Sequence, residues 1–319
     1  MKSYFPKLTL GVLMLSFFSL SVGQAQTNPT ETILSSVQES LNSIISQLRI
    51  LQKEQDLLQE ELDQANRKKN SQQRVDSVLI VAGHTARSPG TTFGSTTEYM
   101  LNYEVMQRVG KLLSEDNRYN HTLSHKGDDY NQTLLDYFSA NEARIIAFKD
   151  QKKREYVREY PLGLTTNDTD HNHATPRGII ELYGVNKWLS EQGIDLAVHV
   201  HFNDYPGRLQ NAAGYHEGFS IFIPPKTNDH FVESYRFAKL LESEMLKHSM
   251  RSTVARESTG ILESELIATG HRNTVNIPSV LLEGGFIYEE KLNDSRRDQS
   301  LDEVARSIYR AIVRYDTNR

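Results

Sequence analysis

The fold is decided by the stretch Leu196-Ala197-Val198-His199-Val200-His201-Phe202-Asn203. Apolar residues run through most of it, and such a run is typical of a parallel strand that is buried on both faces of a sheet. Two histidines lie inside the run and an asparagine ends it. Open α/β sheets bind their ligands at the carboxyl ends of their strands, so these polar residues are candidates for a functional site.

Two further apolar runs carry an ionisable residue in a similar place. The first is Val81-Ala82-Gly83-His84, after which Glu98 opens a helical pattern, and the second is Ile277-Pro278-Ser279-Val280-Leu281-Leu282-Glu283-Gly284-Gly285-Phe286. Imidazole and carboxylate groups suit a divalent metal such as zinc, and the chain has no cysteine to offer instead. Two histidines and one glutamate as ligands, with a second glutamate as base, make a hydrolytic zinc site with an open position for water.

Strand and helix patterns alternate from about Val75 onward, and Thr96 or Thr97 is placed to cap the helix that Glu98 opens. The expected strands cover residues 78–81, 119–124, 195–201, 219–223 and 280–282, and the expected helices cover residues 98–113, 130–158, 178–191, 229–248 and 301–315. Such alternation predicts an α/β fold with a mostly parallel, mixed sheet flanked by helices.

The first residues are typical of a targeting segment. Lys2 and Lys7 form a positive region, residues 8–22 are apolar, and Gly23-Gln24-Ala25 offers small residues for cleavage after Ala25. The apolar run is shorter than the ~20 residues that a membrane-spanning helix needs. We therefore expect a signal peptide over residues 1–25 and export to the periplasm or the cell exterior, with an uncleaved membrane anchor as the alternative.

A heptad repeat follows the targeting segment and predicts a long coiled-coil helix. The apolar positions are Leu34, Val37, Leu41, Ile44, Leu48, Leu51, Leu58, Leu62 and Ala65, with Gln55 at one core position. Such a stripe needs burial against a second copy of the chain, against a regulatory partner protein, or against the chain's own folded domain. We expect homodimerisation, with the coiled-coil helix and its hinge over residues 26–72 and the folded domain over residues 73–319.

Charge and composition exclude some classes of protein. The net charge is −5 and no basic face is evident, which argues against a nucleic-acid-binding protein. The absence of cysteine excludes disulfide bonds and thiolate metal sites.

The candidate segments together resemble one family, the zinc-dependent N-acetylmuramoyl-L-alanine amidases, which remodel the bacterial cell wall. The resemblance is carried by Gly83-His84 after the first strand, Glu98 at the start of a helix, His201-x-Asn203, and the Pro-x-x-Leu-x-Glu-x-Gly-Phe pattern around Glu283. It covers about Val75 to Tyr315, and the segments occur in the order of the family. The chain departs from the family at His199, where a serine is usual.

The resemblance implies a role for each candidate residue. The Zn²⁺ ligands would be His84, Glu98 and His201, and Glu283 would be the general base that hydrolyses the amide bond between N-acetylmuramic acid and L-alanine in peptidoglycan. His199 and Asn203 would contact the substrate or support the ligands, and Arg177 is a further candidate substrate contact.

The residues taken alone leave alternatives open. Glu104 competes with Glu98 as a ligand, and His171 and His173 could form a rival metal site with His199. The same ligands would also serve another exported zinc hydrolase, such as a peptidase or a deacetylase. A third interpretation is a non-catalytic relative that binds cell wall or a partner through the coil.

Overall fold

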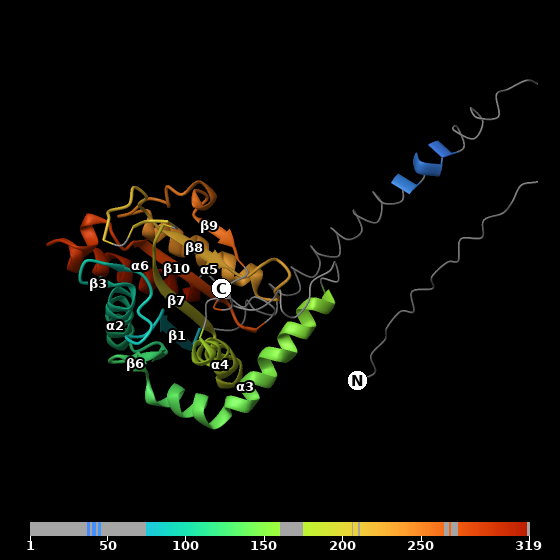
Figure 1. Cartoon of the computed structure of the whole chain (residues 1–319), viewed down its shortest axis with the longest axis horizontal. Coiled ribbons are helices and arrows are strands. Elements are labelled where there is room, and N and C mark those ends of the chain that lie inside the picture. Colours follow the sequence, from blue (N-terminus) through green and yellow to red (C-terminus); the bar gives the residue numbers. More distant parts are fainter. Residues whose placement is uncertain are drawn as a thin grey trace, which may run out of the picture. The chain divides into compact units, whose positions relative to one another are not determined.

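The structure is a computed structural model of the chain, and it describes residues 37–38, 40–42, 44–45, 75–159, 175–205, 207–209, 211–264, 268 and 274–317. The chain divides into two compact units, Met1–Ala65 and Asn66–Arg319. In chain order the described elements of the second unit (Figure 1) are β1 (Ser77–Ala82), β2 (Thr92–Phe93), β3 (Thr96–Thr97), α2 (Glu98–Asp116), β4 (Asn120–Leu123), β5 (His125–Lys126), β6 (Asp129–Tyr130), α3 (Gln132–Glu159), α4 (Pro176–Gln192), β7 (Leu196–Asn203), β8 (Ser220–Ile223), α5 (Phe231–Met245), β9 (Ile261–Glu263), β10 (Ser279–Phe286) and α6 (Arg297–Thr317).

Six strands form one sheet in the order β4-β1-β7-β10-β8-β9. The first four strands in this order are parallel, β8 is antiparallel to β10, and β9 is parallel to β8. The prediction of an α/β fold with a mostly parallel, mixed sheet is therefore confirmed. Since β7 lies between β1 and β10, the carboxyl ends of these three strands meet at one edge of the sheet.

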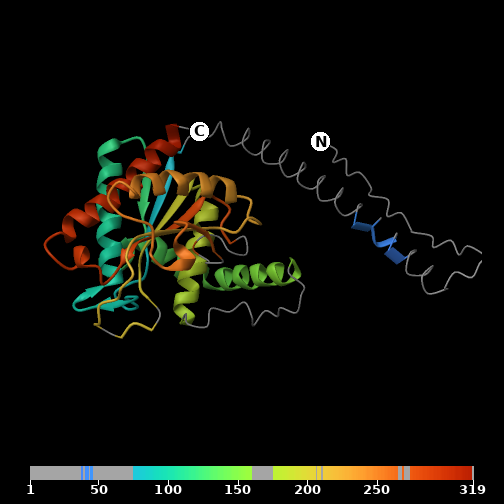
Figure 2. The ribbon, with the colours of Figure 1, turned by 90° about the horizontal axis from the view of Figure 1, so that it is seen from above.

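Helices cover both faces of the sheet. Val78 and Ile80 of β1 belong to the core that α2, α5 and α6 share with the sheet, whereas Leu79 and Val81 belong to the core shared with α3 and α4. In Figure 2, α5 and α6 lie on one side of the strands and α3 and α4 lie on the other. Burial on both faces explains why these strands read as almost continuous apolar runs.

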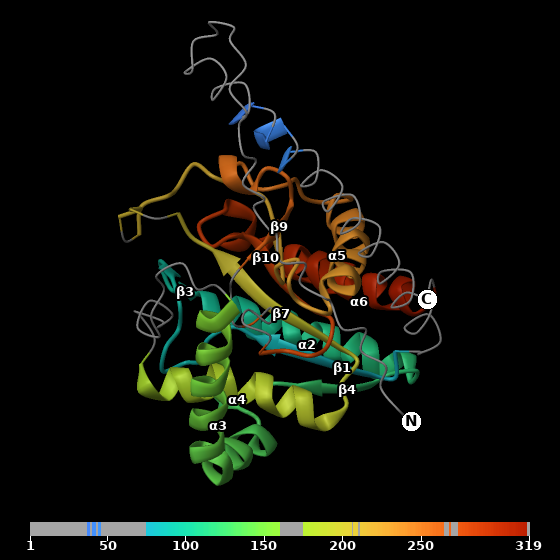
Figure 3. The same cartoon turned by 90° about the vertical axis from the view of Figure 1, so that its right-hand side faces the viewer.

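Side-chain alternation places the candidate residues of β7 and β10 on the α4 side. Ala197 of β7 packs in the core with α4, and His199 and His201 follow it at intervals of two. Glu283 of β10 pairs in register with His201 across the parallel ladder, so its side chain lies on the same face. Figure 3 shows β7 beside β10, with α4 and α3 on one side of β7.

The main helices and strands of the second unit agree with the sequence pattern. Thr97 caps α2 as expected, because its side chain accepts a hydrogen bond from the amide of Met100, which stabilises a helix by about 1 kcal/mol. The helix α3 has a kink at Asn141, which the pattern did not predict. The short strand β9 was also not predicted, because only two apolar residues mark it.

Little of the first unit is described. Val37, Leu41 and Ile44 are helical and exposed, and the predicted burial of the heptad stripe stays a prediction. The rest of the predicted coiled coil, the signal peptide over residues 1–25 and the hinge over residues 70–74 lie outside the described residues. In the described part of the chain, no helix has the length and apolar character needed to cross a membrane.

Candidate metal centre and active site

Three side chains from three elements meet at the carboxyl edge of the sheet. His84 follows β1, Glu98 is the first residue of α2, and His201 lies near the end of β7. Their ligand atoms all lie within 4.8 Å of one another. Two imidazoles and one carboxylate at this spacing can hold a divalent metal ion and leave a position open for water.

The carboxylate of Glu98 lies between the two imidazole rings. Its Oε1 is 2.8 Å from Nδ1 of His201, and its Oε2 is 3.0 Å from Nε2 of His84. The backbone amide of Thr91 also donates to Oε2, at 3.2 Å. Because Glu98 opens α2, its negative charge is stabilised by the helix dipole as well.

Two glycines leave room for this arrangement. A Cβ atom at Gly83 would lie 2.2 Å from the ring of His201, and one at Gly90 would lie 2.3 Å from Oε2 of Glu98. Gly90 also has a φ of +73°, which residues with side chains rarely adopt. His84 itself has a φ of +66°, a strained backbone conformation of the kind that is found at functional sites.

The three groups change one another's ionisation. Burial opposes ionisation of Glu98, but its hydrogen bonds with His201 and His84 outweigh burial and hold its pKa well below the ordinary value. Burial also disfavours the charged form of His84, yet the hydrogen bond and the charge of Glu98 raise the pKa of His84 above its ordinary value. The centre therefore keeps an ionised carboxylate between its histidines.

Glu283 lies on the neighbouring strand, in register with His201. Its Oε2 is buried and has no hydrogen-bond partner among the described residues. Burial, followed by the charges of Glu98 and Glu257, raises the pKa of Glu283 well above its ordinary value. A carboxyl group with a raised pKa is suited to accept and return a proton near neutral pH.

Glu257 is a buried carboxylate that the sequence did not single out. It follows a polar loop, and its Oε2 accepts hydrogen bonds from Asn203 Nδ2 at 3.1 Å and from Ser252 Oγ at 2.8 Å. The candidate residue Asn203 is thereby held at the end of β7, where its Oδ1 accepts from the amide of Asp204. No apolar periodicity surrounds Glu257 in the sequence, so no pattern could have predicted its burial.

The other residues considered differ in their surroundings. His199 is buried on the same face as His201, two residues before it. Arg177 lies in the first turn of α4, is exposed, and donates through Nε to Glu181 at 2.7 Å. Arg208 is a further arginine near Asn203 in the sequence; its side chain is 5% exposed and its Nε pairs with Oδ1 of Asp204 at 2.6 Å.

Of the rival ligands, Glu104 does not join the centre. Glu104 of α2 accepts a hydrogen bond from Arg297 at 2.7 Å and is absent from the group of close ligand atoms. The loop histidines His171 and His173 lie outside the described residues. The rival set of these two with His199 therefore stays a prediction.

A model of the family described as N-acetylmuramoyl-L-alanine amidase matches residues 78–314, and no curated protein sequence matches the chain. Among solved structures, the chain is similar to the apo form of the amidase Ami1 from Mycobacterium abscessus, with 15% identity, a TM-score of 0.50, and coverage of 76% of this chain and 99% of that one.

Two clostridial structures are also similar to the chain. An N-acetylmuramoyl-L-alanine amidase from Clostridium difficile 630 has 17% identity and a TM-score of 0.48, with coverage of 76% of this chain and 97% of that one. The CwlD amidase from Clostridioides difficile, solved in complex with the GerS lipoprotein, has 19% identity and a TM-score of 0.49, with coverage of 76% and 100%. The family match spans most of the chain. The chain belongs to the N-acetylmuramoyl-L-alanine amidase family.

Proposed function

We propose that this protein is a zinc-dependent hydrolase of the amide bond between N-acetylmuramic acid and L-alanine in peptidoglycan. Membership of the amidase family supports the reaction, because peptidoglycan is the substrate of this family. The roles of the residues are assigned from one observation. The ligand atoms of His84, Glu98 and His201 lie within 4.8 Å of one another, and Glu283 pairs with His201 across neighbouring strands.

The residues present fit a zinc ion. His84, Glu98 and His201 would be its ligands, because imidazole nitrogen and carboxylate oxygen are the donors of hydrolytic zinc sites. The space that Gly83 and Gly90 leave for His201 and Glu98 supports this assignment, since any side chain at either glycine would displace a ligand. A zinc ion held there would supply a Lewis acid, which polarises an amide carbonyl and acidifies a water molecule.

In this proposal Glu283 is the group that moves the proton. It takes a proton from the attacking water as the oxygen bonds to the lactyl carbonyl carbon. It then returns this proton to the nitrogen of L-alanine as the carbon–nitrogen bond breaks. A buried carboxyl oxygen without a partner, beside His201, is a suitable place to hold the proton between the two steps.

The proposal extends to the organisation of the whole chain. The signal peptide over residues 1–25, the coiled coil and hinge over residues 26–72 and the catalytic domain over residues 73–319 remain our interpretation of the sequence. Export to the periplasm or the cell exterior would place the domain where its substrate is. The coiled coil would pair with a second copy of the chain or with a regulatory protein.

The test is the identity of the products released from purified peptidoglycan sacculi. Free peptides that begin with L-alanine, together with intact glycan strands, would support the proposed reaction when products are analysed by mass spectrometry. Shortened stem peptides would indicate a peptidase, and loss of acetate would indicate a deacetylase. A protein that binds sacculi and releases nothing would be a non-catalytic relative.

A further inference from the structure

A cavity of about 330 Å³ adjoins the candidate metal centre. His84 and His201 line one side of it, and Leu182 and Val185 of α4 line another. The cavity is therefore formed by the centre itself and by the helix that covers this face of the sheet. A substrate group that enters this cavity must therefore lie only a few covalent bonds away from the amide bond that is hydrolysed.

His199 contributes a polar atom to this cavity. The residue is only 4% exposed, it lines the cavity, and its Nε2 is buried without a hydrogen-bond partner among the described residues. A buried polar atom without a partner destabilises a fold, so such an atom in a native protein needs an explanation. Its place in the wall of a cavity beside the metal centre points to a partner that comes from the substrate.

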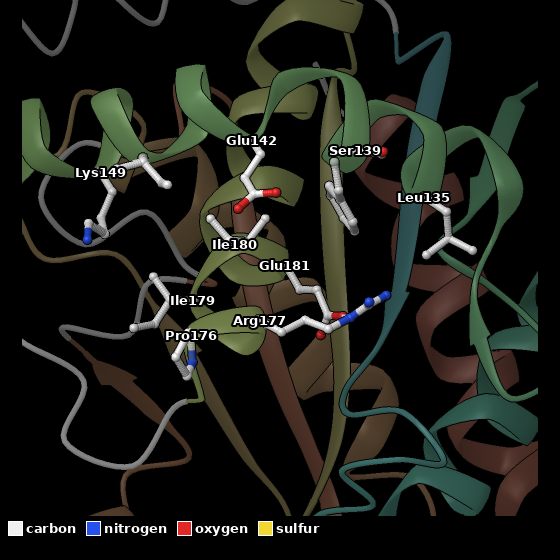
Figure 4. Close-up of a pocket in the computed structure, with 11 residues that line it drawn as sticks. Leu135, Ser139, Glu142, Lys149, Pro176, Arg177, Ile179, Ile180 and Glu181 are labelled. Atoms are coloured by element: carbon white, nitrogen blue, oxygen red, sulfur yellow. The ribbon is translucent and has the colours of Figure 1, made fainter.

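The charged side chains around the cavity favour an uncharged partner. Apart from histidine, none of the described residues that line it is cationic, and Glu181 adds a carboxylate to its wall. The nearby guanidinium groups of Arg177 and Arg87 are paired with Glu181, at 2.7 and 3.4 Å. Figure 4 shows Arg177 directed toward Glu181 along α4, beside a second cavity between α3 and α4. Apart from the histidines and a metal ion that the centre would hold, a carboxylate of the stem peptide would therefore meet no free cation from the described residues of this cavity.

The cavity also offers an apolar surface. Val81, Leu182 and Val185 lie in its wall, which also holds polar side chains, among them His199 with its unpaired Nε2. An occupant that matches both features carries one carbonyl oxygen and one small apolar group.

We propose that this cavity binds the 2-acetamido group of the N-acetylmuramoyl residue, with its carbonyl oxygen hydrogen-bonded to Nε2 of His199. This inference rests on the proposed function, since it assigns a part of that substrate. The acetamido group is attached to the sugar carbon next to the one that carries the lactyl ether, and so lies close to the scissile amide. His199 is then a specificity-determining residue at a position where a serine is usual in the family.

Binding tests the inference without catalysis. In saturation-transfer NMR with N-acetylmuramic acid and the full chain, the acetyl methyl protons should receive the strongest transfer of magnetisation from the protein. His199→Phe, which keeps a ring but removes the polar atoms, should abolish this preference. Transfer centred on the lactyl protons instead, or an unchanged pattern in the variant, would overturn the inference.

Kinetics on two matched substrates provides the second test. One is N-acetylmuramoyl-L-alanyl-D-isoglutamine, and the other carries a hydroxyl group in place of the acetamido group. The wild-type protein should favour the acetylated substrate by at least about 10-fold in kcat/KM, because the second substrate leaves a buried polar atom unpaired. In His199→Phe this ratio should fall to about 2 or less, through a loss on the acetylated substrate alone.

Two further variants separate specificity from folding. His199→Asn supplies an amide donor and should restore part of the ratio, whereas His121→Phe, on β4 away from the cavity, should leave the ratio unchanged. Equal wild-type rates on the two substrates, or a ratio that survives in His199→Phe, would contradict the inference. If the wild type hydrolysed neither substrate, the proposed function would fail, and the NMR pattern would still decide whether the cavity binds the acetamido group.

Discussion

The imidazole ring of His201 lies directly over the backbone of Gly83, so close that a Cβ atom on Gly83 would approach its Cε1 to 2.2 Å. Gly83 lies between the last residue of β1 and His84, and its amide donates a hydrogen bond to the carbonyl of Val200 in β7. The backbone therefore cannot move away from His201 without the loss of a hydrogen bond between the two strands.

Gly83→Ala should displace His201 and lower the affinity for zinc by at least about 10-fold, by analogy with the loss of groups that orient metal ligands. Zinc titration of the metal-free protein, monitored by calorimetry, measures this. Gly94→Ala is a suitable control, because its Cβ would meet no atom within 4 Å and the variant suffers only from a positive φ. If zinc affinity in Gly83→Ala equalled that of the control, the contact would have no role in the metal site.

Removal of any one ligand should empty the centre. His84→Ala, Glu98→Ala and His201→Ala each leave two ligands, too few for tight binding of zinc. Elemental analysis of the folded, dialysed variants should find zinc far below one ion per chain. Glu104→Ala is the matched control on α2, because Glu104 pairs with Arg297 outside the centre. Full zinc content in one of the three variants would show that its residue is not a ligand.

Glu283→Gln should keep the fold and the metal while turnover falls by about 10²–10⁴-fold. The amide has nearly the shape of the carboxyl group but cannot take a proton from water. Release of L-alanine-headed peptides from sacculi measures the turnover. Glu290→Gln is the control, since the side chain of Glu290 is 91% exposed. Wild-type turnover in Glu283→Gln would assign the proton transfer to another group.

The ion pair between Asp204 and Arg208 should make folding stability depend on pH. Partial burial opposes ionisation of Asp204, but hydrogen bonds from Arg208 and Thr91 outweigh it, so the pKa of Asp204 in the folded protein is lowered. A group with a lowered folded pKa stabilises the protein above its unfolded pKa of ~3.9, and this stability is lost as the pH falls through the folded value.

Asp204→Asn should therefore lower the free energy of unfolding by about 1–3 kcal/mol at neutral pH, where the aspartate is charged in both states. Urea denaturation of both proteins at about pH 6 and at about pH 3 should show that this difference shrinks in acid. The pH-dependent part should decrease in an Arg208→Gln background, where only the hydrogen bonds from Thr91 and the backbone remain. A difference that is the same at both pH values would mean that the effect is not electrostatic.

The folded domain should tolerate removal of the chain before Gln73. Val75 is fully buried and its amide donates to Asp316 at 3.1 Å, so a chain that begins at Gln73 keeps this anchor. A chain that begins at Ser77 lacks Val75. Its free energy of unfolding should be lower by about 2 kcal/mol, the contribution of burying one valine side chain. Thermal unfolding compares the two truncated proteins, and equal stability would show that Val75 contributes little.

The same truncation reports on the predicted coiled coil. Full-length protein without the signal peptide should be a dimer in light scattering, and the chain beginning at Gln73 should be a monomer. If both are monomers and truncation raises activity, the heptad stripe packs on the catalytic domain instead. Unchanged mass together with unchanged activity would point to an outside partner.

The sequence by itself was sufficient for the chain order of the main strands and helices in the folded domain and for the layer type. Burial on both faces leaves β1, β7 and β10 as apolar runs, and helical periodicity marks α2, α4, α5 and α6, so local patterns carry this information. His84, Glu98, His201 and Glu283 could be named because each stands at the end of such an element, and because the segments resemble those of the amidase family.

Only the tertiary structure decided which of these residues meet and which do not. Glu98 and Glu104 lie six residues apart on one helix, and sequence spacing alone cannot tell which of them faces a strand that is about a hundred residues away. The fold pairs Glu98 with His201 and Glu104 with Arg297. The burial of Glu257 and of Nε2 in His199 was equally unpredictable, because each depends on packing between elements that are distant in the chain. Local propensity determines an element, whereas the neighbours of a side chain depend on how the elements pack.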